Sequence, residues 1–200
     1  MLWRSPVGCP VILGNPSGKA LGWRGNDFSA TLEASAAVGF EEFMSSVDAI
    51  VMGRKTFETV RDMEDGPMVL LGLRNPFRGA PWPYGDLPVT VLTEKGVVVP
   101  ERLRGGSAAR SFGLREEILA NLAKSGVRDV YVDGGQTIRK FLTAGLLTRI
   151  LVSEVPVTLG DGVPLFSAQD LSRLKEVSSR KLEGGMRQVT YTARARPEHE

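Results

Sequence analysis

Val130-Tyr131-Val132-Asp133-Gly134-Gly135-Gln136-Thr137-Ile138 is the stretch that decides the fold, because an apolar, β-rich run stops at two glycines and continues into a helical pattern. The following residues keep the i, i+3, i+4 apolar spacing of an amphipathic helix, up to a stop at Gly145. Without a Cβ, Gly134 and Gly135 can adopt positive φ and let another group approach the backbone closely. The free N–H groups at such a helix start favour an anion such as a pyrophosphate. The alternative is an ordinary strand-to-helix turn with nothing bound.

A second unit of strand, glycine and helix begins at Asp48. Asp48-Ala49-Ile50-Val51-Met52 is a short apolar run typical of a buried strand, and it stops at Gly53. The next residues open a helix with two cations and a hydroxyl. Arg54 offers a planar fork of donors that suits a phosphate monoester, Lys55 adds a compact charge and Thr56 adds a hydroxyl. The alternative is a solvated helix start with surface cations.

A third strand is expected at Val89-Thr90-Val91-Leu92-Thr93, where β-branched residues dominate. It ends in Thr93-Glu94-Lys95-Gly96. In a strand-helix protein, the carboxyl ends of parallel strands lie at one edge of the sheet. Thr93 and Lys95 would therefore add a hydroxyl and a cation to the edge formed by the two glycine turns.

The C-terminal part is expected to form an antiparallel hairpin. Lys175 to Glu183 and Met186 to Arg194 alternate polar and apolar residues around Gly184-Gly185. The chain thus closes with antiparallel strands on an otherwise parallel sheet. The remaining elements are expected as a first strand at 11–13, a helix ending near 45–46, a polar loop at 61–67, an apolar strand within 68–73, a short β piece at 97–100, a flexible stretch at 102–107, a helix at 114–124 and a strand at 149–155.

Length and composition predict one domain spanning residues 1–200, because 42% hydrophobic content is enough for a sizeable core. The 25 basic and 23 acidic residues leave a net charge of +2, which gives no case for nucleic acid or membrane binding. A single cysteine, Cys9, excludes an internal disulfide and a cysteine metal cluster, and we expect no metal. Since no apolar run approaches a membrane span and prolines interrupt any signal peptide, we expect a cytoplasmic protein.

Four separate motifs, in their order and spacing, resemble the dihydrofolate reductase superfamily. The resemblance is closest to the branch of the C-terminal reductase domain of the bacterial riboflavin-biosynthesis deaminase-reductase, RibD. It covers roughly residues 40 to 60 and 82 to 194. The motifs are Ile50-Val51-Met52-Gly53-Arg54-Lys55-Thr56-Phe57, Trp82-Pro83-Tyr84-Gly85-Asp86, Tyr131-Val132-Asp133-Gly134-Gly135 and Pro156-Val157-Thr158-Leu159-Gly160-Asp161-Gly162-Val163-Pro164-Leu165-Phe166.

The resemblance implies a dihydrofolate-reductase-like α/β fold, with a mixed, mainly parallel sheet flanked by helices and NADPH bound across the strand ends. It implies an NADPH-dependent reductase acting on a small heterocycle, such as a pteridine or a pyrimidine ribityl-type precursor. A homodimer follows by analogy alone. The residues implied to bind the cofactor are Gly53, Arg54, Lys55 and Thr56 at the 2′-phosphate, Thr93, Glu94 and Lys95 at the adenosine ribose, and Gly134, Gly135, Gln136, Thr137 and Ile138 at the pyrophosphate.

The substrate side departs from the family pattern. Asn15-Pro16-Ser17-Gly18-Lys19 stands where the family has a Ser-Leu-Asp-Gly-like turn, and it has no acid before the glycine. The catalytic residue therefore stays unassigned. Asp27 and Glu154 are carboxylates to test, with Glu154 expected to face solvent rather than a cleft, while His199 lies among charged residues at the C-terminal end.

Two further functions stay open. The chain could be a dihydrofolate reductase proper, although the missing acid argues against it. It could also bind a nucleotide without catalysis, because the residues of the cofactor side match the family while those of the substrate side do not.

Overall fold

The computed structural model describes residues 7–9, 13–14, 43–65, 69–70, 73–74, 82, 84–103, 108–111, 114–154, 165–182 and 187–193. Its strands are β1 (Val7–Cys9), β2 (Leu13–Gly14), β3 (Ala49–Gly53), β4 (Val69–Leu70), β5 (Leu73–Arg74), β6 (Val89–Leu92), β7 (Ala108–Ser111), β8 (Val130–Asp133), β9 (Arg149–Glu154), β10 (Leu174–Lys181) and β11 (Arg187–Ala193). Its helices are α2 (Arg54–Asp65), α3 (Arg115–Lys124), α4 (Gly135–Thr143) and α5 (Ala168–Ser172), with a 3-10 turn η1 (Glu101–Leu103).

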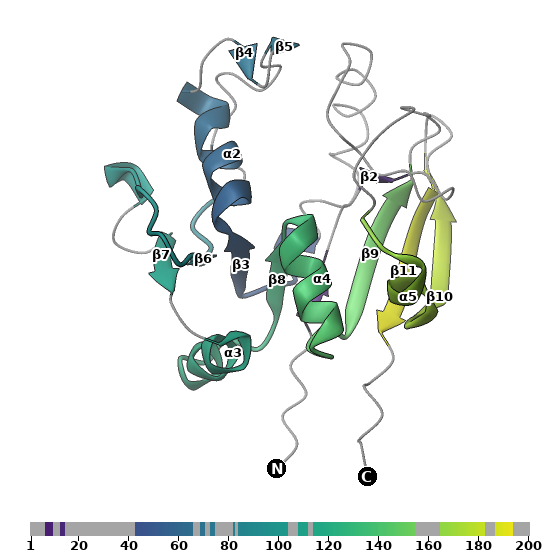
Figure 1. Ribbon diagram of the computed structural model, residues 1–200. Helices are drawn as coiled ribbons and strands as arrows, with labels where there is room; N and C mark the ends of the chain where they lie inside the picture. Colours follow the sequence, from purple (N-terminus) through teal and green to yellow (C-terminus); the bar gives the residue numbers. More distant parts are fainter. Residues whose placement is uncertain are drawn as a thin grey trace.

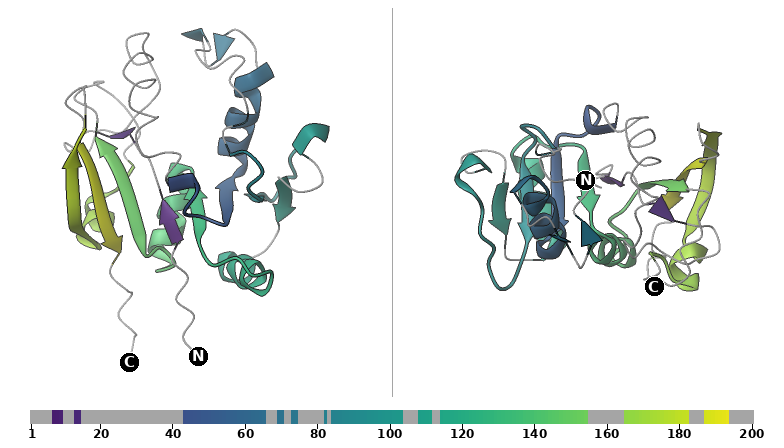
Figure 2. Two further views of the ribbon diagram at one scale, coloured as in Figure 1. Left: turned by 180° about the vertical axis from the view of Figure 1, so that it is seen from behind. Right: turned by 90° about the horizontal axis from the view of Figure 1, so that it is seen from above.

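One mixed sheet organises the described elements (Figure 1). Its strand order is β10-β11-β9-β1-β8-β3-β6-β7, and β2 adds to β9. The pairs from β9 through β1, β8, β3 and β6 to β7 are parallel, whereas β11 runs antiparallel to both β9 and β10. The predicted mixed, mainly parallel sheet with an antiparallel C-terminal hairpin is therefore confirmed. Views from behind and above show the β10–β11 pair at one end of the sheet and β7 at the other (Figure 2).

The central strands are buried because helices cover the sheet. Ala49, Ile50, Val51 and Met52 of β3 have no exposed surface, and Val132 of β8 has none either. Such continuous apolar runs are typical of parallel strands with both faces covered. Helix α4 lies in front of β8 in Figure 1 and contacts both β8 and β3.

Helices α2, α3 and α4 contribute apolar side chains to this core. Phe57 of α2, Phe141 and Leu142 of α4, and Leu119 of α3 are at most 2% exposed. Burying each of these side chains stabilises the fold by roughly 1.5–3 kcal/mol. The amphipathic patterns predicted for 114–124 and for the helix after Gly134 are thus confirmed. In the described part of the chain, no helix is long and apolar enough to cross a membrane.

Several expected elements differ from the structure. The polar loop at 61–67 was wrong up to Asp65, because no glycine or proline stops α2 before Gly66-Pro67. The single strand within 68–73 is instead the short hairpin β4–β5. Residues 97–100 form no strand. The first strands that the structure describes are at 7–9 and 13–14, and residues 11 and 12 of the expected first strand lie outside the described residues.

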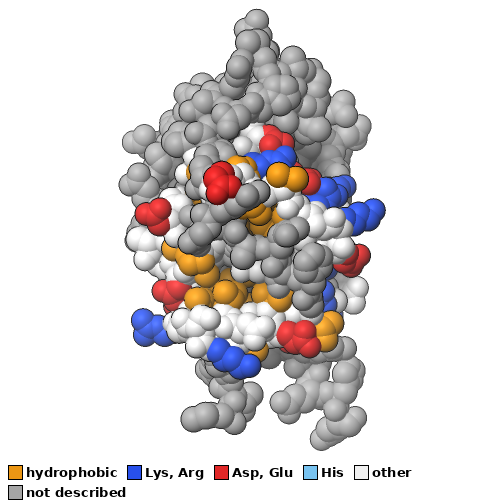
Figure 3. Space-filling view, turned by 90° about the vertical axis from the view of Figure 1, so that its left-hand side faces the viewer, with side chains coloured by type: hydrophobic (Ala, Val, Ile, Leu, Met, Phe, Trp, Pro, Cys, Tyr) orange, Lys and Arg blue, Asp and Glu red, His pale blue; other side chains and the backbone are white. Residues whose placement is uncertain are grey.

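A few large apolar side chains of the described residues are exposed. Val98 is 73% exposed and Leu114 is 63% exposed, whereas Val177 of β10 is 52% exposed. Figure 3 shows the side of the molecule that lies on the left in Figure 1, where hydrophobic side chains reach the surface among charged ones. Strand β10 is exposed along almost its whole length, from Lys175 to Lys181.

Candidate functional site

Three strand ends bring the predicted site residues to one edge of the sheet. In the parallel ladders, Gly53 of β3 pairs with Leu92 of β6, and Met52 pairs with Asp133 of β8. The starts of α2 and α4 and the turn after β6 therefore leave the sheet at the same level. This agrees with the shared edge predicted from the sequence. Ligand binding by these residues stays a prediction.

The two helix starts interlock through a repeated Gly-x-x-Thr pattern. A Cβ added to Gly53 would lie 2.8 Å from Thr137 Oγ1, and one added to Gly134 would collide with Thr56 Oγ1. Gly134 also has φ +93, a conformation that residues with a Cβ rarely adopt. Each glycine thus makes room for the threonine of the other helix, and the hydroxyls of Thr56 and Thr137 point between the helices.

The backbone at the start of α4 supplies anion-binding donors. The first turn of a helix leaves its N–H groups without intrahelical acceptors, here those of Gly135, Gln136 and Thr137. The N–H of Ile138 is already bonded to the Gly134 carbonyl at 2.9 Å, and its side chain is 1% exposed. Ile138 is therefore a core residue and offers a ligand neither its side chain nor its N–H.

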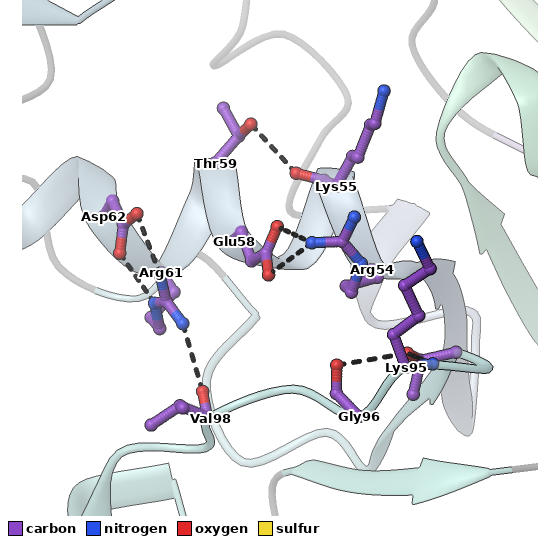
Figure 4. Close-up of polar contacts among 10 residues, drawn as sticks. Arg54, Lys55, Glu58, Thr59, Arg61, Asp62, Lys95, Gly96 and Val98 are labelled. Carbon is purple, nitrogen blue, oxygen red and sulfur yellow. Dashed lines mark hydrogen bonds and ion pairs between the residues drawn. The ribbon is translucent and has the colours of Figure 1, made fainter.

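Three cations follow the ends of β3 and β6, and the Lys55 side chain extends away from Arg54 (Figure 4). Arg54 Nη1 donates to both carboxylate oxygens of Glu58, at 2.8 and 2.7 Å. Lys55 and Lys95 form no ion pair with any described residue. The turn that carries Lys95 is held by Thr93, whose Oγ1 accepts from the Lys95 N–H and donates to the Gly96 carbonyl, both at 3.2 Å. Thr93 therefore stabilises the turn, and its hydroxyl proton is already donated to the Gly96 carbonyl.

A cation-lined pocket of about 570 Å³ lies between the start of α3 and the outer face of α4. Its charged residues are three cations and a single carboxylate, Glu116. Arg115 Nε is buried and has no hydrogen-bond partner in the described structure, so this donor is available to an anion. The lining residues are Arg115, Glu116, Gln136, Arg139, Lys140, Thr143 and Ala144.

This pocket extends the predicted site, because Gln136 belongs both to the glycine turn and to the pocket. The sequence reasoning missed Arg139 and Lys140. The signal was present: residues 136, 139, 140 and 143 fall on one helical face, opposite the buried Phe141 and Leu142. Arg115 could not be placed against α4 from the sequence, since helix-to-helix distances are not encoded in local spacing.

A partly buried carboxylate, Asp133, ends β8 directly before the glycine turn. Its Oδ1 accepts from the Gly134 N–H at 2.7 Å, and its Oδ2 accepts from the Tyr84 hydroxyl at 2.6 Å. Burial raises the pKa of Asp133, while hydrogen bonds from Tyr84, Gly134 and Tyr131 oppose that rise. Burial and then the charge of Asp133 raise the pKa of Tyr84 well above its ordinary value. The sequence signal for Asp133 was a carboxylate inside an apolar strand, and it was passed over.

Tyr84 belongs to a chain of edge-to-face aromatic contacts. Ring centroids are 5.9 Å apart between Phe57 and Trp82, 5.1 Å between Trp82 and Tyr84, 6.3 Å between Tyr84 and Tyr131, and 5.5 Å between Tyr131 and Phe43. This chain joins α2 to β8 and fixes the Tyr84 hydroxyl on Asp133.

Of the other carboxylates considered from the sequence, the structure describes Glu154, the last residue of β9. Glu154 was expected to face solvent, but only 12% of its side chain is exposed because Arg187 covers it with an ion pair of 3.3 Å. Asp27 and His199 lie outside the described residues. Among the residues that the structure describes, no group of three or more His, Cys, Asp and Glu side chains could hold a metal ion.

The sheet order and the cation-rich strand ends define the class of dihydrofolate-reductase-like α/β proteins. Residues 14–187 match the model of the RibD C-terminal domain, and the chain belongs to that family. The suspected resemblance is therefore confirmed.

Individual proteins agree with this assignment. The chain is 28% identical over 159 residues to the uncharacterized protein YyaP of Bacillus subtilis (strain 168), a match that covers 77% of this chain and 78% of YyaP. A putative riboflavin biosynthesis protein from Shewanella sp. PV-4 is similar in structure, with a TM-score of 0.74 and 26% identity, covering 96% of this chain and 99% of that one. The family and this neighbour support a RibD-like reductase.

Dihydrofolate reductase from Enterococcus faecalis, complexed with NADP(H), has a TM-score of 0.54 and 17% identity. The match covers 96% of this chain and 99% of that one. At this identity the likeness shows the fold alone.

Proposed function

We propose that this protein is an NADPH-dependent oxidoreductase that transfers hydride to a small heterocyclic substrate. The reaction would be related to that of the 5-amino-6-(5-phosphoribosylamino)uracil reductase of riboflavin biosynthesis. The proposal includes a cytoplasmic enzyme and a homodimer, both by analogy with the family.

The observation that carries the proposal is the presence of cations in two places, at the ends of β3 and β6 and in the pocket along α4. NADPH carries anionic groups at two places, the pyrophosphate and the 2′-phosphate. Arg54 and Lys55 open α2 and Lys95 follows β6, whereas Arg139 and Lys140 line the pocket along the outer face of α4. Arg139 and Lys140 lie further along α4, with Lys140 in its last turn. Two separate groups of cations suit a ligand with two separated phosphates.

The residues present fit such a cofactor at the level of donor chemistry. The first N–H groups of α4 and the Gln136 side chain would meet the pyrophosphate, and the buried, unpartnered Arg115 Nε would gain an acceptor in the pocket. Arg54, Lys55 and Lys95 would meet the 2′-phosphate. When bound, NADPH supplies the hydride, while the protein supplies orientation and electrostatics.

Asp133 is the described residue best suited to hold a proton near the strand ends. A heterocycle that accepts hydride at a C=N or C=O group needs a proton on the adjoining heteroatom. Burial raises the pKa of Asp133, so its carboxyl keeps a proton at higher pH than an exposed aspartate does. The Tyr84 hydroxyl, bonded to Oδ2 at 2.6 Å, fixes the orientation of that carboxyl.

The test is a titration of the purified protein with NADPH and with NADH, followed by tryptophan fluorescence. Trp82 suits this readout because its ring contacts Phe57 of α2. We expect NADPH to bind more tightly than NADH. Replacing Arg54 with Ala should weaken the binding of NADPH roughly tenfold or more, because a hydrogen bond to a charged group is lost. The same substitution should change the affinity for NADH little.

The matched control removes a cation from another part of the surface. Lys181 lies on the exposed strand β10, so Lys181→Ala removes the same charge and should leave both affinities unchanged. Equal losses of NADPH and NADH in Arg54→Ala, or no binding by the folded wild-type protein, would contradict the proposal. A turnover panel that includes dihydrofolate then identifies the acceptor.

A further inference from the structure

One carboxylate stands directly among the cations assigned to the 2′-phosphate. Glu58 lies one helical turn after Arg54 on α2, and both of its oxygens contact Arg54 Nη1. The side chains of Arg54 and Glu58 are 35% and 33% exposed, so the pair sits at the surface where a ligand can reach it. The other carboxylate nearby, Glu94, is exposed and forms no ion pair with a described residue.

This ion pair is weak enough to be displaced. Exposed i, i+4 pairs on a helix contribute only a few tenths of a kcal/mol, because solvent screens both charges. Arg54 also keeps its Nε–H and two Nη2 hydrogens, which have no acceptor among the described residues. A phosphate monoester could therefore contact Arg54, but it would do so beside a carboxylate of the same sign.

The charge balance at this edge depends on Glu58. Arg54, Lys55 and Lys95 provide three positive charges, and Glu58 neutralises the one with the best geometry for a phosphate. A phosphate monoester carries close to two negative charges at neutral pH, so its repulsion from Glu58 is stronger than that of a singly charged group. A nucleotide without this phosphate is far less sensitive to Glu58.

We infer that Glu58 is a specificity-determining residue that competes with the 2′-phosphate for Arg54 and thereby limits the preference for NADPH over NADH. The inference rests on the proposed cofactor site. Glu58 thus has a role opposite to that of the cations around it. Its carboxylate weakens the binding of NADPH, which carries the 2′-phosphate, and leaves the binding of NADH almost unchanged.

The experiment compares Glu58→Gln with wild type by isothermal titration. The probes are 2′,5′-ADP and 5′-AMP, which differ in the 2′-phosphate and carry no nicotinamide, together with NADPH and NADH. Glu58→Gln keeps the shape of the side chain and removes its charge. We expect 2′,5′-ADP and NADPH to bind roughly threefold to tenfold more tightly, while 5′-AMP and NADH change less than about twofold. Raising the salt concentration should shrink this gain.

Asp62→Asn is the matched control. Asp62 lies on the same helix one turn further on and pairs with Arg61 at 2.6 Å, so the substitution removes an equal charge away from the turn. It should leave all four affinities within about twofold. A second variant combines Glu58→Gln with Arg54→Ala, and there the gain should disappear because the contested guanidinium is gone.

The outcomes separate the inference from the proposed function. If wild type prefers NADPH but Glu58→Gln leaves that preference unchanged or lowers it, Glu58 orients Arg54 or has no role, and the inference alone is overturned. If the folded wild type binds none of the four probes, the inference and the proposed function are overturned together. Circular dichroism of each variant shows whether the fold is intact.

Discussion

Replacing Gly53 with alanine should destabilise the protein, and removing the Thr137 hydroxyl should reverse most of that loss. The added Cβ would lie 2.8 Å from Thr137 Oγ1, which is its only close contact in the described structure. Thr137 is 7% exposed and cannot move aside, because Ile138 and Phe141 anchor α4 in the core.

The size of the effect follows from two opposing contributions. Overpacking of this kind costs about 1–3 kcal/mol. Replacing glycine by alanine in extended backbone returns about 0.5–1 kcal/mol, because the unfolded chain loses fewer conformations. The net loss for Gly53→Ala should be about 1–2 kcal/mol. Thr137→Ala alone should cost about 1 kcal/mol for a buried methyl group.

The assay is urea unfolding of the four proteins of a double-mutant cycle, followed by circular dichroism. With the clash removed, Gly53→Ala/Thr137→Ala should be about 0.5–1 kcal/mol more stable than Thr137→Ala, which corresponds to a coupling of about 1–3 kcal/mol. Gly53→Ala combined with Thr137→Ser is the control, because serine keeps Oγ1 and should not rescue stability. Additive losses in the cycle, or a Gly53→Ala protein as stable as wild type, would refute the interlocked packing.

Two other predictions concern carboxylates. The pKa of Asp133 in the folded protein lies above its ordinary value of 3.8, so the neutral carboxyl stabilises the folded state. This stabilisation is fully present below the unfolded pKa and is lost as pH rises through the folded pKa. The stability of wild type relative to Asp133→Asn should therefore fall in urea titrations as pH rises from 3.8 through the folded pKa, and a constant difference would contradict the raised pKa of this carboxyl. Asp48 shows the opposite dependence, because hydrogen bonds from the Asp129 and Arg128 N–H groups lower its pKa below 3.8. The ionised Asp48 therefore stabilises the fold at neutral pH, and this stabilisation is lost as pH falls through the folded pKa. Asp48→Ala should cost about 1 kcal/mol at neutral pH and almost nothing at low pH, and an equal cost at both would show that these bonds contribute little.

The parts of the fold that could be predicted from the sequence are those encoded locally. Apolar runs that end in glycine identified β3 and β8, and the helical spacing after each glycine identified the starts of α2 and α4. The shared edge followed from one rule about parallel strands, and the register between Gly53 and Leu92 agrees with it.

The parts that could not be predicted depend on contacts between distant residues. Tyr84 and Asp133 are 49 positions apart, and no local pattern indicates that their side chains meet. The strand β7 was missed because its sequence, Ala-Ala-Arg-Ser, lacks β-branched residues and pairs only through its neighbour β6. Conversely, the pairing of Arg54 with Glu58 follows from i, i+4 spacing and was available from the sequence.

The exposed strand β10 forms one end of the sheet in the part of the chain that the structure describes. An end strand offers its outer backbone groups to any extended segment, including another molecule of the same protein. Here Lys175, Glu176, Arg180 and Lys181 are exposed charged residues of that strand, although Glu176 also pairs with Arg187 and Arg180 donates to Gln188 of β11. A strand added to β10 would partly desolvate these charged side chains, which costs free energy. We therefore expect concentrated protein to resist fibril formation through this edge of the sheet.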